Sequence, residues 1–180
     1  MLTIGDRFPE FRLKGVVSAD PAVPFETFDN ASFPGDWKVF VFYPKDFTFV
    51  CPTELVGFGK LQSAFADRDV RLFAVSTDNE FVHLAWRRDH TDLRTLPFPM
   101  LSDIRRDLST ALGVLDPDEL VCMRATFVVD PQGVIRHVSV YDGSVGRNPD
   151  EVLRTIDALQ TDELCPCNWK NGEATIQVGV

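Results

Sequence analysis

Apolar residues gather in short runs that alternate with helical patterns through the middle of the chain. The runs 39–43 and 71–77 are mainly apolar, which is typical of strands covered on both faces. After each run, apolar residues recur at intervals of three and four, which predicts helices over 52–67 and 79–89. The second helix should turn four residues inward: Phe81, Val82, Ala85 and Trp86. The pattern therefore predicts two consecutive strand–helix units.

The flanking segments predict the rest of the fold. In chain order they are short strands or a hairpin within 3–30, a loop over 30–37, an extended connector over 97–103, a short helix over 104–112, a β-hairpin of 125–130 with 134–141, and a helix that Asn148 begins. This order predicts an α/β fold of the thioredoxin-like type, with a mixed central sheet, flanking helices and extra N-terminal strands. From Thr161 the chain is polar, so we predict one domain over 1–160 and a C-terminal tail over 161–180.

Composition and charge narrow the class of protein. The chain has 180 residues, of which 44% are hydrophobic, and a net charge of −9. The negative charge argues against nonspecific binding to nucleic acid, which needs a basic face. No apolar run approaches the roughly 20 residues that a membrane-spanning helix needs, and the first residues lack the pattern of a signal peptide. We therefore expect a cytoplasmic protein that binds neither nucleic acid nor a membrane.

Cys51 stands where the first strand–helix unit changes from strand to helix. Pro52 and Glu54 follow it, and both are typical of the first turn of a helix. The unpaired backbone N–H groups at a helix N-terminus favour negative charge, which for a cysteine means the thiolate, its nucleophilic form. The competing interpretation is a small buried hydrophobic residue. We predict a reactive cysteine at the cap of this helix.

Four cysteines in a cytoplasmic chain indicate catalysis or metal binding more than a structural disulfide framework. Cys165 and Cys167 lie close together in the sequence, and the chain has three histidines. However, a Cys-x-Cys pair lacks the usual gap of a zinc site, and no second pair accompanies it. We therefore predict no metal site. Further expectations are His83 and His90 on helix surfaces, Cys122 as an inert buried thiol, and Phe47, Phe49 and Trp169 in packing roles.

The residues around Cys51 form a motif. Pro44, Thr48 and Cys51 give the spacing Pro-x-x-x-Thr-x-x-Cys, and the run Phe-Val-Cys-Pro-Thr-Glu continues it. This segment resembles the active-site signature of the peroxiredoxins, in particular the typical two-cysteine branch that contains the alkyl hydroperoxide reductase peroxidases. The resemblance implies a thiol-dependent peroxidase that reduces hydrogen peroxide and organic hydroperoxides without a metal, haem or flavin cofactor. Pro44 would shield the pocket from water, and Thr48 would accept a hydrogen bond from the peroxide or orient it.

Two arginines and a glutamate extend the resemblance. Arg124 lies in Arg-Ala-Thr-Phe, which resembles a family segment whose arginine completes the active site by donating to the thiolate and the peroxide. A solvated surface arginine is the competing interpretation. Glu54 and Arg147 resemble the family's supporting hydrogen-bond partners, although Glu54 could also cap the helix.

Ionisation alone does not account for a fast thiol peroxidase. Lowering the pKa of a generic cysteine thiol from about 8.5 to about 6 raises its thiolate fraction at pH 7 about 30-fold. Nucleophilicity falls with the pKa, with a slope of about 0.4–0.5, which removes a factor of about 13–18. The net gain is about twofold. Orientation of the peroxide and stabilisation of the departing oxygen must therefore supply most of the rate.

The C-terminal tail carries the second predicted thiol. Its run Cys-Pro-Cys-Asn-Trp resembles the family's Val-Cys-Pro-x-x-Trp segment, so Cys165 takes the position of the resolving cysteine. The resemblance implies that the Cys51 sulfenic acid condenses with Cys165 of the other subunit in an antiparallel homodimer, after the first turn beyond Cys51 unwinds and the tail is released. Cys167 stands where a small residue is common. It is either an alternative resolver or relay to the reductant, or a spectator.

The resemblance also implies partners. Electrons would come from a dithiol protein: a thioredoxin-like protein, a flavoprotein disulfide reductase or a carboxymuconolactone-decarboxylase-like reductase. The homodimer would assemble into a ring of five dimers. The sequence lacks the Gly-Gly-Leu-Gly loop and C-terminal Tyr-Phe of members sensitive to overoxidation, so we expect a comparatively robust enzyme. The rival functions are a redox sensor or holdase chaperone on the same fold, and a cysteine hydrolase, which would need a histidine base near Cys51.

Overall fold

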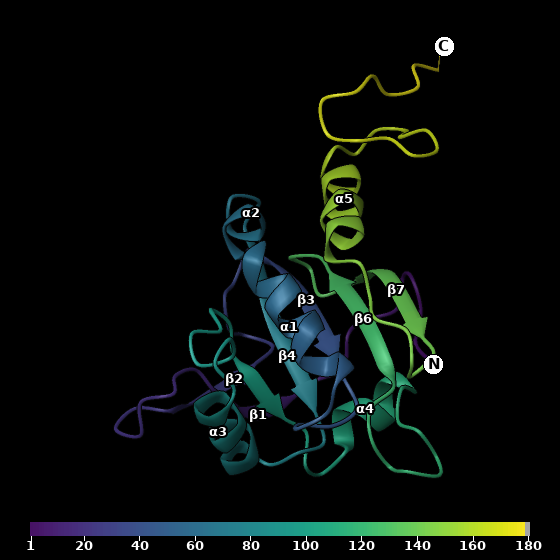
Figure 1. The fold of residues 1–180 in the computed structure, drawn as a ribbon. Helices are drawn as coiled ribbons and strands as arrows, with labels where there is room; N and C mark the ends of the chain where they lie inside the picture. Colours follow the sequence, from purple (N-terminus) through teal and green to yellow (C-terminus); the bar gives the residue numbers. More distant parts are fainter. Residues whose placement is uncertain (179–180) are drawn as a thin grey trace.

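The chain folds around one mixed sheet of seven strands (Figure 1). The computed structural model describes residues 1–178. Its elements are, in chain order, β1 (Arg12–Val16), β2 (Phe25–Asp29), β3 (Trp37–Phe42), α1 (Val50–Lys60), α2 (Gln62–Ala66), β4 (Val70–Ser76), α3 (Glu80–Asp89), β5 (Met100–Ser102), α4 (Asp107–Leu112), β6 (Arg124–Val129), β7 (Ile135–Tyr141) and α5 (Pro149–Gln160). The strand order is β2-β1-β5-β4-β3-β6-β7. Strands β3, β4 and β5 run parallel, and the other neighbours pair antiparallel.

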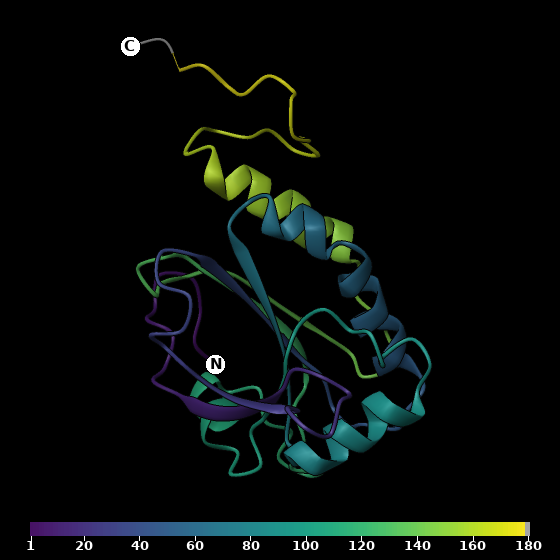
Figure 2. The same cartoon turned by 90° about the vertical axis from the view of Figure 1, so that its left-hand side faces the viewer.

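The central strands β3, β4 and β6 are buried on both faces of the sheet. Helices α1, α2 and α5 form a layer on one side of it (Figure 2). Alternate residues of a strand point to opposite faces, and β3 sends Val39 and Val41 into the hydrophobic cluster beneath this layer. Phe40 and Phe42 enter a second cluster, to which α4 and the N-terminal segment contribute. Burial on both sides explains why this strand is apolar at nearly every position.

Most of the predicted elements are present. β3–α1–β4 and β4–α3–β5 are the two strand–helix–strand units, β6 and β7 form the predicted hairpin, and β1 and β2 pair within the N-terminal region. Asn79 and Asn148 cap α3 and α5 by accepting hydrogen bonds from backbone N–H groups. Helix α5 ends at Gln160, and the described part of the tail extends beyond this end of the helix (Figure 1). The predicted α/β organisation with a mixed sheet is confirmed.

The single helix predicted over 52–67 is wrong. It is divided into α1 and α2, because Leu61 between them leaves the helical conformation, with φ −96° and ψ 5°. Glycine weakens a helix, and Gly57 and Gly59 lie just before this break. A Cβ atom at Gly57 would lie only 3.2 Å from Pro149, at the start of α5. The glycine therefore allows α1 and α5 to approach closely, at a cost in helix stability.

Two further boundaries are corrected. The connector predicted over 97–103 contains β5, which fills the sheet between β1 and β4. The short helix predicted from Ile104 begins only at Asp107, which leaves Ile104 47% exposed. The reason is Arg106, whose left-handed backbone, with φ 62°, cannot continue a right-handed helix.

Of the four residues predicted to face inward on α3, only Trp86 is fully buried. Phe81 is 64% exposed and Ala85 is also exposed, whereas His83, Trp86 and Arg87 are buried. The prediction of a surface position for His83 is therefore wrong. An inward stripe chosen from apolar residues misses histidine and arginine, because polar side chains can be buried where their hydrogen bonds are satisfied inside the protein.

Arg87 connects three backbone segments beneath α3. Its guanidinium donates to the carbonyl oxygens of Val16 at 2.9 Å, Phe98 at 3.3 Å, and Leu96. Burial lowers the pKa of Arg87 to about 10. This side chain thus links α3 to the end of β1 and to the segment that precedes β5.

We expect Arg87→Lys to lower the free energy of unfolding by about 1–3 kcal/mol. A lysine ammonium cannot reproduce the planar fork of donors, so at least one buried carbonyl loses its partner. Arg88→Lys, at the exposed neighbouring position, should change stability by less than about 0.5 kcal/mol. Denaturant unfolding of the reduced protein measures both, and equal stability of the two variants would contradict the structural role of Arg87.

Candidate active site

Cys51 is the second residue of α1 and is 1% exposed. The helix begins at Val50, so the predicted cap position of the cysteine is wrong by two residues. Phe49 is the N-cap, and its side chain makes no capping hydrogen bond. The backbone N–H groups of the first turn still lack helical carbonyl partners, so this end of α1 favours negative charge, as a cap position does.

Arg124, the first residue of β6, lies beside the cysteine. Its Nη1 is 3.6 Å from the Cys51 Sγ, and the same nitrogen donates to Glu54. Its Nη2 donates to the carbonyl oxygen of Gly143 at 2.8 Å. The residue is 3% exposed, so it is not a solvated surface arginine. Two residues 73 positions apart in the sequence are thus brought into contact.

Glu54 joins Arg124 to the second predicted arginine. Glu54 Oε1 accepts from the backbone N–H of Arg147 and from its Nε, both at 2.8 Å, while Oε2 accepts from its Nη2 at 2.9 Å and from Arg124. Arg147 also donates to the carbonyl oxygen of Ala125 at 2.8 Å. The glutamate therefore holds both guanidinium groups and does not serve as a helix cap.

The side chains beside Cys51 form a charged cluster of one carboxylate and two guanidinium groups. Burial alone would raise the pKa of Glu54, but hydrogen bonds and charge from Arg147, with the charge of Arg124, hold that pKa below its ordinary value. Burial likewise opposes the charge of Arg124, yet the contacts with Cys51 and Glu54 raise its pKa. Two guanidinium groups and one carboxylate leave an excess of one positive charge next to Cys51, which complements a thiolate.

A pocket of about 400 Å³ opens onto the sulfur, and Pro44, Thr48, Cys51 and Arg124 are all in its wall. The Thr48 hydroxyl donates to the carbonyl oxygen of Lys45 at 2.9 Å. Because its one proton is used there, its oxygen remains an acceptor for a molecule in the pocket. The structure thus brings together all four residues predicted for the reactive centre, as well as the two predicted to support it.

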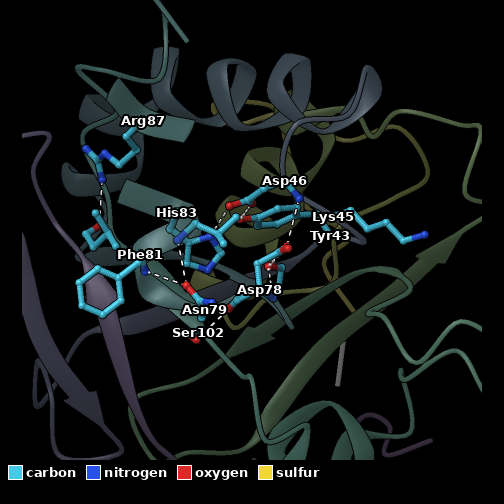
Figure 3. A network of polar contacts seen from close by, with 12 residues as sticks. Tyr43, Lys45, Asp46, Asp78, Asn79, Phe81, His83, Arg87 and Ser102 are labelled. Carbon is cyan, nitrogen blue, oxygen red and sulfur yellow. Dashed lines mark hydrogen bonds and ion pairs between the residues drawn. The ribbon is translucent and has the colours of Figure 1, made fainter. Parts of the chain in front are cut away.

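Sequence reasoning missed a buried polar cluster behind the pocket (Figure 3). Asp46 Oδ1 accepts from the Tyr43 hydroxyl at 2.8 Å, and Asp46 Oδ2 is 2.7 Å from His83 Nδ1. The signal was present in the spacing, because His83 lies three residues before Trp86 on the same face of α3. No contact joins His83 to Cys51 among the described residues, so this histidine is not placed as a base for the thiol.

The two aromatic residues of the loop before α1 differ in their packing. Phe49 is 94% exposed, so its predicted packing role is wrong. Phe47 is 53% exposed, but its ring centroid lies 6.0 Å from that of Trp86, so it does pack against α3. Trp169 is 2% exposed, as expected of a packing residue. Exposed aromatic side chains beside a pocket are typical of a surface that contacts another protein.

The tail cysteines lie far from the reactive centre. The tail extends from the end of α5 that points away from the beginning of α1, as the two views show (Figures 1 and 2). Cys165 Sγ is 3.5 Å from the Thr161 hydroxyl, and Cys167 is exposed. All four cysteines lie among the described residues and are free thiols. Cys122 lies two residues before β6 and is buried, and this burial raises the pKa of its thiol, as expected of an inert residue.

Residues 1–178 hold neither a metal cluster nor a membrane-spanning helix. No group of three or more His, Cys, Asp or Glu side chains is arranged to hold a metal ion within this part of the chain. None of the described helices is long and apolar enough to cross a membrane.

Known proteins are similar to this chain in both fold and sequence. A solved structure of Mycobacterium tuberculosis AhpC aligns with a TM-score of 0.87 and 53% identity, covering 94% of this chain and 99% of that one. A reduced 2-Cys peroxiredoxin of Plasmodium vivax aligns with a TM-score of 0.90 and 33% identity, covering 97% and 93%. The alkyl hydroperoxide reductase C of Mycolicibacterium smegmatis is 54% identical over 99% of this chain and 95% of its own length.

The thioredoxin-like fold and the buried cysteine site define a peroxiredoxin, a thiol-dependent peroxidase. Within that class the chain belongs to the AhpC/TSA family, whose model matches residues 4–138. The fold predicted from the sequence and the family resemblance of its motifs are both confirmed.

Proposed function

We propose that the protein reduces hydrogen peroxide and organic hydroperoxides with Cys51 as the nucleophile. The Cys51 thiolate attacks one oxygen of the peroxide, so that an S–O bond forms as the O–O bond breaks. The departing alkoxide or hydroxide takes up a proton and leaves as alcohol or water, and the sulfur, oxidised by two electrons, is a sulfenic acid. The observation that carries the proposal is the 3.6 Å contact of Arg124 Nη1 with the Cys51 sulfur in the wall of an open pocket.

Charge and hydrogen bonding at the pocket support this reaction. Arg124 lies in the pocket wall with Nη1 3.6 Å from the sulfur, so its guanidinium can donate to a peroxide oxygen on which charge develops there. Thr48 can accept from the peroxide O–H, which turns the reactive oxygen toward the sulfur. Pro44 limits the access of water at the same wall.

We propose that Cys165 of a second subunit resolves the sulfenic acid. Its thiol attacks the Cys51 sulfur, a disulfide forms, and water leaves. The position of the tail away from α1 supports a partner from another chain (Figure 2). A dithiol protein then returns both cysteines to thiols and is itself oxidised. That reductant would be a thioredoxin-like protein, a flavoprotein disulfide reductase or a carboxymuconolactone-decarboxylase-like protein.

We further propose that the protein is an oligomer and acts in the cytoplasm. An antiparallel homodimer, further assembled into a ring of five dimers, would cover apolar side chains that are exposed in the single chain, such as Phe49 and Phe81. Four free thiols fit the reducing cytoplasm.

The test of the peroxidase is a stopped-flow reaction of the reduced protein with hydrogen peroxide, followed by addition of each of the three reductants. A fast reaction of Cys51 with renewed turnover supports the enzyme. A slow reaction that no reductant recycles would overturn the proposal and favour the redox sensor or the holdase chaperone.

Cys165→Ser should abolish the intersubunit disulfide while leaving the first oxidation of Cys51 unchanged. The reason is that a serine hydroxyl cannot condense with a sulfenic acid, whereas the pocket residues are untouched. Non-reducing electrophoresis and peptide mass spectrometry measure the linkage. Cys167→Ser is the matched control. If it turns over normally and only Cys51–Cys165 linkages appear, Cys167 is a spectator; Cys51–Cys167 linkages would make it an alternative resolver.

A further inference from the structure

The segment from Pro44 to Val50 carries the pocket residues that precede Cys51. Of these seven residues, all of which the structure describes, Asp46 alone is buried. Its carboxylate contacts His83 at 2.7 Å, with side-chain exposures of 1% for the aspartate and 0% for the histidine. The segment is therefore attached to α3 through one buried polar contact (Figure 3).

The same cluster of polar contacts extends to β4 and β5, two interior strands of the sheet. The backbone N–H of Asp46 donates to Asp78 Oδ2 at 3.0 Å, and Asp78 Oδ2 also accepts from the Ser76 hydroxyl at 2.7 Å. His83 Nε2 lies 3.3 Å from the carbonyl oxygen of Leu101. Both ring nitrogens of His83 thus face acceptors, so the imidazole is fixed between the segment and β5.

The backbone next to Asp46 is in an unfavourable conformation. Phe47 has φ 55°, in the left-handed region that a bulky residue rarely adopts. Such a conformation persists only where surrounding contacts impose it. Asp46 precedes Phe47 directly, so its buried contacts hold this turn closed together with the Phe47 ring, whose centroid lies 6.0 Å from that of Trp86 on α3.

The closed segment suits one step of the proposed reaction and blocks the next. A small peroxide can enter the pocket of about 400 Å³. A thiol carried on a protein chain cannot approach a sulfur that is 1% exposed while the segment and the first turn of α1 remain in place. Peroxide reduction therefore requires the closed form, and disulfide formation requires the open one.

We propose that Asp46 and His83 are positioning residues whose contact sets how often this segment opens, and hence the fate of the Cys51 sulfenic acid. The inference rests on the proposed function. In the closed form a second hydroperoxide can transfer an oxygen to the sulfenic acid, which becomes a sulfinic acid while the peroxide leaves as alcohol or water. In the open form the Cys165 thiol attacks instead, and the products are a disulfide and water. A stronger contact favours the first outcome and a weaker contact the second.

The test compares His83→Leu and Asp46→Asn with the wild type as full-length, reduced protein. Hydrogen peroxide is added over a range of concentrations, and mass spectrometry counts the sulfinic acid and the disulfide at Cys51. Loss of one charge-assisted hydrogen bond should raise the peroxide concentration that gives half sulfinic acid about tenfold. The rate constant of the first oxidation, followed by stopped flow, should change by less than about twofold, because the closed form remains the major one.

Two further variants complete the design. His83→Asn keeps an amide nitrogen close to the position of Nδ1. It should return the ratio of sulfinic acid to disulfide at Cys51 toward that of the wild type. His90→Leu, at the C-cap of the same helix but outside the cluster, should behave as the wild type. If His83→Leu does not fold, Asp46→Asn decides the outcome.

The outcomes separate this inference from the proposed function. A wild-type protein that forms no Cys51–Cys165 disulfide would overturn the proposed function itself. A normal wild type, with folded variants that partition as it does, would overturn only the role of Asp46 and His83. So would a parallel loss of oxidation rate and disulfide, since that is the mark of a merely structural defect.

Discussion

Arg124→Met should lower the second-order rate constant of Cys51 oxidation by about two to three orders of magnitude. Methionine fills a similar volume, but it cannot donate to the sulfur, which Arg124 Nη1 approaches within 3.6 Å, or to the peroxide oxygens. A hydrogen bond from a charged donor is worth most where water is excluded, and this residue is 3% exposed. Stopped-flow reaction of the reduced protein with hydrogen peroxide measures the loss.

Three control variants test whether the lost rate is due to the guanidinium. Cys51→Ser gives the background rate of peroxide consumption, because it removes the proposed nucleophile. Arg124→Lys keeps the charge but loses the fork of donors, so it should lie between Arg124→Met and the wild type. Arg136→Met, on β7, removes an arginine that pairs with Asp130 instead of with the site, and should react as the wild type. A reaction of Arg124→Met within threefold of the wild type would show that the guanidinium does not act on the peroxide.

Glu54→Gln should lower the free energy of unfolding by about 3–5 kcal/mol, which is the usual cost of removing one member of a buried ion pair. The carboxylate is 3% exposed and accepts from both Arg124 and Arg147. A glutamine would leave two buried guanidinium groups without a counterion. Denaturant unfolding of the reduced protein measures the change. Glu151→Gln breaks an exposed pair with Arg154 and should cost less than about 1 kcal/mol; equal losses in the two variants would contradict the prediction.

The same carboxylate predicts a dependence on pH. The pKa of Glu54 is lower in the folded protein than its ordinary value of 4.5, so the unfolded chain binds the proton more readily. Its contribution to stability is therefore complete above about pH 4.5 and is lost as the pH falls through the lower, folded pKa. The stability of the wild type should decline more steeply in this acid range than that of Glu54→Gln, as denaturant unfolding at a series of pH values would show.

The sequence was sufficient to predict which residues gather at the candidate site, because they lie in short, specific segments. The motif around Cys51 and the segment that begins with Arg124 identified both, and the sheet order explains their contact, since β6 pairs directly with β3. The strands were predictable for a similar reason. A strand buried on both faces, such as β3, is apolar at nearly every position.

The buried polar residues were not predictable from apolar periodicity. His83 is polar and still lies at the centre of α3's inward face, because Asp46 and the Leu101 carbonyl satisfy it there. Phe49 is apolar and still exposed, because the turn at the start of α1 directs it outward. The partners that decide the burial of His83 are distant from it in the sequence, so periodicity within α3 does not reveal them.

Glu54 also limits how far the nucleophile can travel. Its carboxylate is held by two arginines and by the backbone of Arg147, so unwinding of α1 that preserves these bonds must end before residue 54. Cys51 then swings on a tether of three residues, whose fully extended length is about 10 Å. The oxidised sulfur accordingly stays near the mouth of its own pocket. The tail, whose Cys165 we propose as the resolving thiol, lies at the far end of α5 and has to cover the remaining distance by coming to it.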